Sequence, residues 1–315
     1  MRVFVTGASG WIGSALVPEL IQAGHDVVGL ARSEASADAL SAAGAEVHHG
    51  SLEDLESLGA GAAKSDGVIH LAFIHDFSRY EASVRADQRA IETLGAALQD
   101  SERPLVIASG VLALTQGGVA TEEDPPHPDF PRSPAATMTL ALAERGVRSS
   151  VVRLPPSVHG EGDNGFVPTL INIAREQCRS GYVGDGANHW PAVHRNDAAS
   201  LFRLAVENAP AASVLHAVSD EGIPTRAIAE VIGRHLDVPV VSVPPDQAAD
   251  HFGWLGPFFA ADVAASSALT RERLDWKPTH PGLIEDLEQG HYFRDPSRRA
   301  LPCNSASRIS PRRRG

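Results

Sequence analysis

The sequence contains little cysteine, and this scarcity excludes two kinds of site. Cys178 and Cys303 are the two cysteines among 315 residues, so a disulfide scaffold is excluded. Their spacing also lacks the pattern of a cysteine metal site. Scarce cysteine fits a reducing compartment, and Met1-Arg2 leads straight into Val3-Phe4-Val5 without a signal-peptide pattern, so we expect a cytoplasmic protein.

Positive charge and long apolar runs are also scarce. The 39 acidic residues outnumber the 27 basic ones and give a formal net charge of −12, which disfavours a protein whose main function is to bind nucleic acid. No run of about 18 apolar residues exists, so we expect no segment that spans a membrane. Hydrophobic residues still make up 43% of the chain, which is enough for a substantial core in one large or two modest domains.

Short apolar strands alternate with amphipathic helices over about the first 160 residues. This alternation predicts an α/β fold with a doubly wound parallel sheet and helices on both faces. The continuously apolar run Gly67–Phe73 is typical of a strand buried on both sides. The predicted strands cover 2–6, 26–31, 46–48, 67–73, 104–109 and 147–154. One predicted helix begins near residue 11, and the others cover 34–42, 81–99 and 135–145.

The pattern changes after Pro155-Pro156, where we predict a second, smaller domain. We expect residues 1–160 plus about 188–218 to form the first domain, and about 161–187 and 219–293 to form a smaller C-terminal α/β domain. Further helices are predicted over 167–175, 196–208, 224–236 and near 280–291, and further strands over 189–193, 214–218 and 238–243. Seven arginines among Pro, Ser and Asn predict a disordered basic tail over 294–315. Residues 121–134 contain five prolines, so we predict a loop there and expect it to cover another part of the protein.

A glycine-rich loop, TGASGWIG over residues 6–13, stands between the first predicted strand and helix. A strand before it and an amphipathic helix after it are the context of a dinucleotide-binding βαβ unit. Gly7 would permit the tight turn, Gly10 would let a pyrophosphate approach the backbone, and Gly13 would let the helix pack closely on the sheet. The free N–H groups and positive helix end attract the phosphates.

The motifs together resemble those of extended and atypical short-chain dehydrogenases/reductases, the NAD-dependent epimerase/dehydratase superfamily. The spacing Thr-Gly-x-x-Gly-x-x-Gly is similar to that of the superfamily, and the similarity covers about residues 1–293. It implies a Rossmann fold and a nicotinamide cofactor. In the superfamily, the strand beside the adenine ribose matches VIHLA at 68–72, and the strand with the active-site serine matches VIASG at 106–110. The other matching segments are VRLPPSVHG at 152–160, VGDG at 183–186 and HRNDAA at 194–199.

The end of the second strand indicates which cofactor binds. An NAD enzyme usually places Asp or Glu there for the ribose 2′-OH, whereas this chain reads Leu30-Ala31-Arg32-Ser33. A guanidinium binds a 2′-phosphate through charge-assisted hydrogen bonds, so we favour NADP(H). Glu34 remains available for a ribose hydroxyl, and NAD(H) therefore stays open. The expected cofactor contacts are Gly7, Ser9, Gly10, Trp11, Ile12, Gly13, Arg32, Ser33, Leu52, Leu71, Ala72, Pro155 and Val158.

The catalytic Tyr-x-x-x-Lys pair that the resemblance implies is absent. None of the three tyrosines has lysine four places later, and the two lysines, Lys64 and Lys277, lie far from the expected position. That position holds Pro131-Arg132-Ser133-Pro134. Arg132 can bind or polarise a substrate oxygen but cannot act as an acid, because arginine does not deprotonate in proteins.

The remaining catalytic candidates are one serine and two histidines. Ser109 ends the fifth strand, where ligands bind in open parallel sheets, and would donate a hydrogen bond to a substrate carbonyl. His127 and His159 are candidates for acid–base work because an ordinary imidazole titrates near neutral pH. His194 is interpreted as structural, and the neighbouring His48-His49 is not expected to hold a metal.

The leading hypothesis is an NAD(P)-dependent oxidoreductase that transfers hydride between nicotinamide and a small carbonyl or alcohol substrate. A nucleotide-binding sensor without turnover and a nucleotide-sugar epimerase or dehydratase remain as alternatives. Phe166, Trp190, Phe252 and Trp254 would close over the substrate or form core. The resemblance also implies a homodimer through helices near 81–99 and 135–145.

Overall fold

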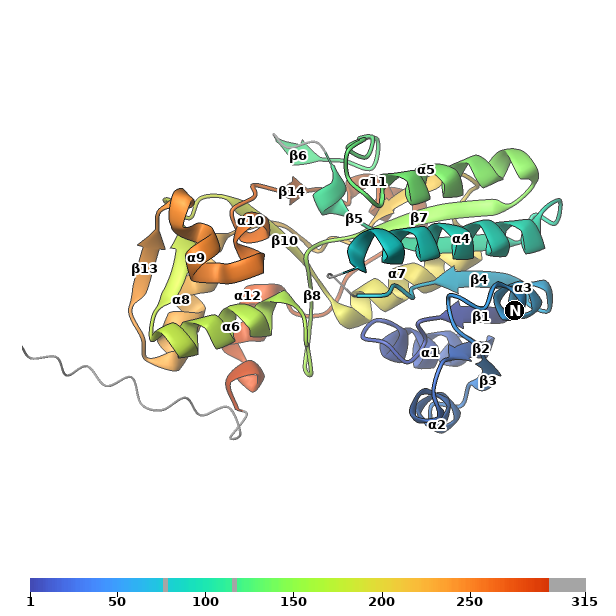
Figure 1. Cartoon of the computed structure of the whole chain (residues 1–315), viewed down its shortest axis with the longest axis horizontal. Coiled ribbons are helices and arrows are strands. Elements are labelled where there is room, and N and C mark those ends of the chain that lie inside the picture. The colour runs from blue at the N-terminus through green and yellow to red at the C-terminus, as the bar shows by residue number, and fades with distance from the viewer. Residues whose placement is uncertain (76–78, 115–117, 295–315) are drawn as a thin grey trace, which may run out of the picture.

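The computed structural model describes residues 1–75, 79–114 and 118–294, and the structural statements below refer to these ranges. Figure 1 shows a larger lobe built around a sheet and containing the N-terminus, with a smaller lobe of mainly orange and light green elements beside it. Within the described ranges, no helix combines the length and the apolar character that crossing a bilayer requires.

A seven-stranded parallel sheet forms the centre of the larger lobe. The strand order β11-β7-β5-β4-β1-β2-β3 shows that the chain winds outward on one side of β1 and then returns to the other side. This order confirms the predicted α/β class with a doubly wound parallel sheet. The strands are β1 (Arg2–Thr6), β2 (Asp26–Ala31), β3 (Glu46–His49), β4 (Gly67–His70), β5 (Pro104–Gly110), β7 (Arg148–Leu154) and β11 (Ser213–His216).

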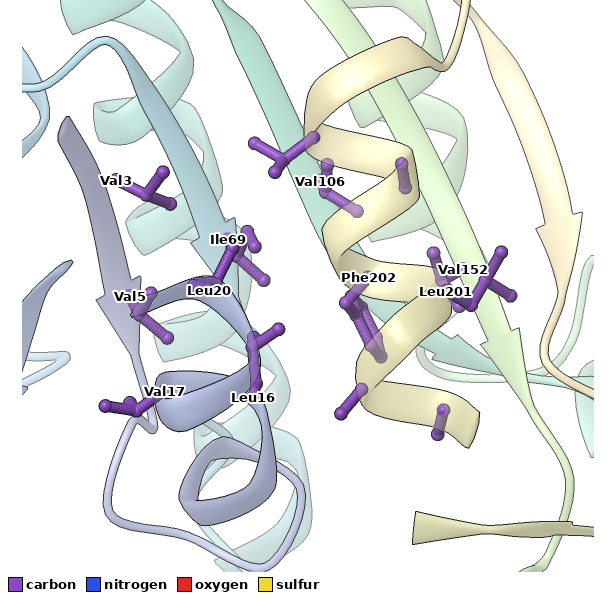
Figure 2. Packing of buried hydrophobic residues seen from close by; sticks show 14 of the residues in the cluster. Val3, Val5, Leu16, Val17, Leu20, Ile69, Val106, Val152, Leu201 and Phe202 are labelled. Atoms are coloured by element: carbon purple, nitrogen blue, oxygen red, sulfur yellow. The ribbon is translucent and has the colours of Figure 1, made fainter. Parts of the chain in front are cut away.

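Helices cover both faces of this sheet because side chains alternate along each strand. Val3 and Val5 of β1 belong to one core with Leu16 and Phe202, as Figure 2 shows, whereas Phe4 belongs to the opposite core with Ile91. The first face carries α1 (Gly13–Gln22), α2 (Glu34–Ala42) and α7 (Arg195–Asn208). The other face carries α3 (Leu55–Ala63), α4 (Tyr80–Leu98), α5 (Ser133–Ala141) and the 3₁₀ turn η3 (Leu142–Arg145).

The smaller lobe has its own core, in which Trp190, Ile228 and Phe259 are almost completely buried. Its two-stranded sheet pairs β9 (Ser180–Val183) with β13 (Val240–Val243). Its helices are α6 (Phe166–Gln177), α8 (Thr225–Leu236), α9 (Ala248–Phe252), α10 (Gly256–Phe259) and α12 (Leu283–Glu288), with the short turns η4 (Pro245–Gln247), η5 (Gly253–Leu255) and η6 (His291–Phe293).

Short strands join the lobes. A three-stranded sheet orders β12 (Asp220–Pro224), β10 (His189–His194) and β8 (Ser157–His159), and β6 (Val119–Ala120) pairs with β14 (Ala264–Ala265). The turn η2 (Val111–Ala113) follows β5, and α11 (Ala268–Leu274) contacts α7 and β11. The carboxyl ends of β1, β4 and β5 therefore meet near the place where the lobes join (Figure 1).

The structure corrects several predicted boundaries. The strand predicted over Gly67–Phe73 ends at His70, and α1 begins at Gly13 rather than near Trp11. The last helix, predicted near 280–291, is limited to Leu283–Glu288, and the strand predicted over 214–218 ends at His216. Helix α3 was not predicted, although Asp54 caps it by accepting the Ser57 N–H. Arg294 is the last described residue, so the predicted tail lies almost wholly outside the described ranges, as does Cys303.

The separate cores support the division into two domains, which we keep as a proposal: residues 1–160 plus about 188–218 for the nucleotide, and about 161–187 plus 219–293 for the substrate. The loop predicted over 121–134 is largely irregular, although α5 begins within it at Ser133.

Candidate functional site

The glycine loop connects β1 to α1 through a tight turn. Gly7 adopts a φ of +69°, and an added Cβ would lie 2.7 Å from the Ala72 nitrogen. A Cβ on Gly13 would lie 2.1 Å from the Gly7 carbonyl oxygen, so this glycine permits close packing against the loop itself rather than against the sheet. A Cβ on Gly10 would meet only the backbone of Gly7, with the carbonyl oxygen nearest at 3.1 Å. Side chains are therefore excluded at two positions by the protein, while at Gly10 the one close neighbour is a carbonyl oxygen.

The first turn of α1 is suited to bind an anion. Its N-cap residue, Ile12, makes no side-chain cap hydrogen bond to the described residues, and Ser9 and Gly10 are exposed beside it. Two amides of this turn, those of Ser14 and Ala15, already donate to backbone carbonyl oxygens. The two amides before them have no acceptor among the described residues, and the helix dipole is positive there. The loop thus fits a pyrophosphate, which is the group that a dinucleotide would place on it.

Trp11 links this loop to the other side of the site. Its indole N–H donates to the Val158 carbonyl oxygen at 2.7 Å, and the Arg195 guanidinium lies 4.2 Å from the ring centroid. Of the neighbouring predicted contacts, Leu71 and Ala72 are half-buried after β4, and Pro155 is buried after β7. The Trp11 ring therefore holds β8 against the glycine loop.

A hollow of about 230 Å³ lies at the carboxyl ends of β2 and β3. Arg32 and Ser33 are exposed at its rim, and the Ser33 hydroxyl caps α2 by accepting the Ser36 N–H at 3.3 Å. Leu52, the predicted adenine contact, is only 8% exposed and belongs to the core. The lining residues are Ala31, Arg32, Ser33, Glu34, His49, Gly50, Ser51 and Asp54.

Arg132 lies at the amino end of α5, close to the end of β5. Its Nη2 donates to the Ala108 carbonyl oxygen at 3.1 Å and lies 3.6 Å from Asp87 Oδ2. The guanidinium also lies 4.3 Å from the centroid of the Phe73 ring. Because Ser109 follows Ala108 in β5, the structure brings Ser109 and Arg132 to the same edge of the sheet.

His75 and Tyr80 surround the Phe73 ring and were not predicted as site residues. The Phe73 centroid lies 5.3 Å from that of His75 and 6.1 Å from that of Tyr80. Burial and then the Arg132 charge lower the pKa of His75. Burial raises the pKa of Tyr80, while the Arg132 charge opposes that rise. Both groups therefore lie within the electrostatic reach of Arg132.

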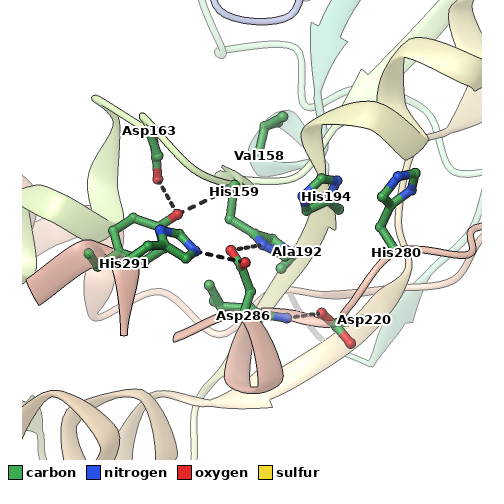
Figure 3. A network of polar contacts seen from close by, with 12 residues as sticks. Val158, His159, Asp163, Ala192, His194, Asp220, His280, Asp286 and His291 are labelled. Carbon is green, nitrogen blue, oxygen red and sulfur yellow. Dashed lines mark hydrogen bonds and ion pairs between the residues drawn. The ribbon is translucent and has the colours of Figure 1, made fainter. Parts of the chain in front are cut away.

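The two predicted catalytic histidines lie in different surroundings. His127 is exposed, its Nδ1 accepts the Asp129 N–H, and its carbonyl accepts the Ser133 hydroxyl. His159 is completely buried, and its Nδ1 lies 2.9 Å from Asp286 Oδ2. In Figure 3, Asp286 also contacts His291. His159 is thus part of a buried network.

The aromatic side chains predicted for the second domain also divide. Trp190 and Phe252 are 2% and 3% exposed and form core, whereas Trp254 is 53% exposed. Phe166 lies 5.5 Å from Trp254 and 5.8 Å from Trp190, measured between ring centroids. The half-buried Phe166 therefore connects core aromatics with exposed ones. In the described ranges, no group of three or more His, Cys, Asp or Glu side chains is arranged to hold a metal.

Asp87 and His70 are two further polar side chains that the sequence did not identify as site residues. Asp87 is completely buried in α4, and its Oδ1 lies 3.1 Å from Nε2 of His70 at the end of β4. His70 stands inside the VIHLA segment, but its side-chain partner lies 17 residues further along the chain. No motif links these positions, so an aspartate within a mainly apolar helix face is the single available signal.

The sequence is similar to a known protein family and to individual known proteins. The model of the NAD dependent epimerase/dehydratase family matches residues 3–216. An uncharacterized protein of Schizosaccharomyces pombe is 51% identical over 295 residues, which is 93% of this chain and 100% of that protein. A 4-hydroxy-2-methyl-3-oxo-4-farnesyl-3,4-dihydroquinoline-1-oxide ketoreductase of Stigmatella aurantiaca is 29% identical over 80% of both chains.

A solved structure shows the same fold at low identity. The dTDP-glucose 4,6-dehydratase from Streptomyces venezuelae, solved with NAD bound, superposes with a TM-score of 0.74 at 19% identity. The superposition covers 93% of this chain and 97% of that one. The shared architecture therefore extends over both lobes.

Proposed function

Because this chain belongs to the NAD-dependent epimerase/dehydratase family, we propose that it is an NAD(P)-dependent oxidoreductase that acts on a small carbonyl or alcohol substrate. One observation carries the proposal: the first turn of α1 follows the carboxyl end of β1, and Ser109 and Arg132 lie at the carboxyl end of β5, with β4 between the two strands. This edge is where open α/β sheets bind their ligands.

The preferred cofactor in this proposal is NADP(H). Arg32 and Ser33 are exposed at the rim of the hollow beyond β2, where a 2′-phosphate would meet a guanidinium. Glu34 lines the same hollow, so NAD(H) remains the second candidate. Gly7, Ser9, Gly10, Trp11, Ile12 and Gly13 would hold the pyrophosphate through the loop.

Ser109 and Arg132 would act on the substrate oxygen. When bound, the nicotinamide supplies or accepts the hydride. During reduction of a carbonyl, the oxygen gains negative charge, which the Ser109 hydroxyl and an Arg132 N–H would stabilise by hydrogen bonding. The oxygen then takes a proton from another group, because Arg132 cannot give one up.

Tyr80 and His75 are our candidates for the proton donor. Both lie beside the Phe73 ring that carries Arg132 on its face, and both sense the charge of Arg132. The proposal gives no chemical step to His159, since its ring is buried and bonded to Asp286. His127 stays at the loop over the amino end of α5, where it would help to enclose the substrate.

The direct test follows the absorbance of NADPH and NADH at about 340 nm with a panel of ketones and aldehydes, and the reverse reaction with alcohols. We expect turnover with at least one carbonyl class, and a loss of about 10²- to 10³-fold in kcat for Arg132→Gln. Calorimetry with each cofactor is run in parallel. Tight cofactor binding without turnover over a broad panel would favour a nucleotide sensor, and failure to bind either cofactor would refute both functions.

A further inference from the structure

Contacts within the protein hold Arg132 but do not engage every hydrogen-bond donor of its guanidinium. Nη2 donates to the Ala108 carbonyl oxygen, the Phe73 ring lies under the guanidinium plane, and the side chain is only 24% exposed. Nε is buried and has no hydrogen-bond partner in the described ranges. A buried N–H without a partner is uncommon and needs an explanation from its surroundings.

Asp87 carries the negative charge beside this guanidinium. Its side chain is completely buried, and its Oδ1 contacts His70 Nε2. Its Oδ2 has no hydrogen-bond partner among the described residues and lies 3.6 Å from Arg132 Nη2. A buried carboxylate is costly unless a cation and hydrogen bonds compensate it. Oδ2 is aimed at Arg132, so the aspartate and the arginine compensate each other.

The contacts continue from Asp87 to the glycine loop. His70 Nδ1 lies 2.8 Å from the Thr6 hydroxyl, which also accepts the Ala72 N–H at 3.3 Å. One assignment of protons satisfies every contact: His70 Nε2–H donates to Asp87, and Nδ1 accepts the Thr6 O–H. Thr6 precedes Gly7 directly, so a buried polar chain connects the phosphate loop with Arg132.

We propose that Asp87, oriented by His70, is a positioning residue that fixes the Arg132 guanidinium beside Ser109 for the substrate oxygen. This inference rests on the proposed function for its catalytic consequence and on the geometry alone for the arrangement. Asp87 does not touch the substrate. Its removal would let the guanidinium turn away from the Ala108 carbonyl, and a misplacement of about 1 Å can cost about 100-fold in rate.

A double-mutant cycle tests whether Asp87 acts through Arg132. Using NADPH and the best carbonyl of the panel, kcat and KM are measured for wild type, Asp87→Asn, Arg132→Lys and the double variant. We expect Asp87→Asn to lower kcat/KM about 100-fold in the wild-type background and less than about 2-fold in the Arg132→Lys background, where no guanidinium remains to be positioned. Equal losses in both backgrounds, or no loss in either, would overturn the positioning role.

Ser83→Ala is the matched control on the same helix. Ser83 is also buried in α4, one turn before Asp87, and its hydroxyl donates only to the Arg79 carbonyl among the contacts described. We expect this variant to keep wild-type kcat and KM. The cofactor dissociation constant should stay within about 2-fold in Asp87→Asn, since the aspartate acts at the substrate end.

A second measurement uses the wild-type chain, so it requires neither catalytic turnover nor a folded variant. Nitrogen-15 NMR of the full wild-type chain reports which ring nitrogen of His70 carries the proton. We expect Nε2 to carry a proton, as the contact to Asp87 requires. A proton on Nδ1 alone would overturn the inference, because Asp87 would then lack its donor. If this spectrum agrees but no carbonyl is reduced, the proposed function fails and the arrangement stands.

Discussion

The three glycines of the loop differ in what an added methyl group would meet. At Gly13 it would overlap the carbonyl oxygens of Gly7 and Ala8, at 2.1 and 2.6 Å, whereas at Gly10 its nearest neighbour would be one oxygen at 3.1 Å. We expect Gly13→Ala to lower the free energy of unfolding by about 1–3 kcal/mol, as overpacking does. Gly10→Ala should cost clearly less, because only one carbonyl oxygen must give way, and should weaken NADPH binding at least about 10-fold, because we expect the phosphates to lie against this position.

Urea unfolding and calorimetry with NADPH separate these two effects. The two variants control for each other. Gly13→Ala perturbs mainly the packing of the protein, and Gly10→Ala perturbs mainly the space expected for the cofactor. Unchanged NADPH affinity in Gly10→Ala would show that the loop does not bring a pyrophosphate against this position.

Arg32 offers a test of cofactor preference at the other end of the nucleotide. Its side chain is exposed at the rim of the hollow beyond β2, so its removal should not disturb the core. Loss of one charge-assisted phosphate contact corresponds to about 1.5–3 kcal/mol, so we expect Arg32→Ala to weaken NADPH about 10- to 100-fold. NADH affinity, measured by calorimetry on the same variant, should change less than about 2-fold. Equal weakening of both cofactors would assign Arg32 to a part that they share.

The residues of the site differ in how far the sequence could predict them. The glycine positions follow from a spacing that directly encodes backbone geometry, and Gly7 has the positive φ that the predicted tight turn requires. Arg132 could be located because it occupies the place of an absent motif. Asp87 and His70 could not be paired, since their contact depends on how α4 packs on the sheet rather than on their spacing.

Elements were predictable where their hydrophobic periodicity was strong. Helix α4 extends over 19 residues with one buried face, and its predicted boundaries were each one residue away. Helix α3 reads LESLGAGAA, and its two glycines and small side chains weaken both helix propensity and periodicity. β4 ends at His70, where the chain leaves the sheet although apolar residues continue. Apolar character alone does not mark that departure.

Helix α7 provides a prediction at the scale of one element. Phe202 is completely buried in the core that α7 shares with α1 and the sheet, as Figure 2 shows. Truncating a buried phenylalanine removes its transfer free energy and leaves a cavity, so we expect Phe202→Ala to lower the free energy of unfolding by about 3–5 kcal/mol. Leu204→Ala, at a partly buried position of the same helix, should cost clearly less. Urea unfolding measures both, and equal costs would contradict the packing described for α7.

At the scale of the whole molecule, the two lobes meet through polar side chains from distant segments. His194 ends β10, and its Nδ1 accepts the Asn196 N–H to cap α7. Its ring stacks on His280 with centroids 4.6 Å apart, and the His159 ring meets its edge at 5.4 Å. Asp197 and Asp286 are the carboxylates whose charges act on the ring. These groups come together only in the folded chain, so the pKa of His194 depends on the folded arrangement of both lobes.

The pH dependence of stability follows from this environment. Burial, and then the neighbouring His159 and His280, lower the pKa of His194 to about 4, whereas Asp286 and Asp197 partly oppose the shift. In the unfolded chain the same ring titrates near about 6.5. Between these values the unfolded chain binds a proton that the folded chain does not. The stabilising contribution is therefore complete above about pH 6.5 and is lost as the pH falls toward about 4.

His194→Asn isolates this contribution, because asparagine retains the acceptor that caps α7 and removes the titrating ring. We expect the wild-type free energy of unfolding to fall between about pH 7 and pH 5 by roughly 1 kcal/mol more than that of the variant, well below the full linkage value because solvent screens a half-exposed ring. Urea unfolding at several pH values in this range gives both slopes. His127→Asn, at an exposed position on the loop before α5, is the control and should keep the wild-type slope. Parallel slopes for wild type and His194→Asn would show that His194 titrates alike in the folded and unfolded chains.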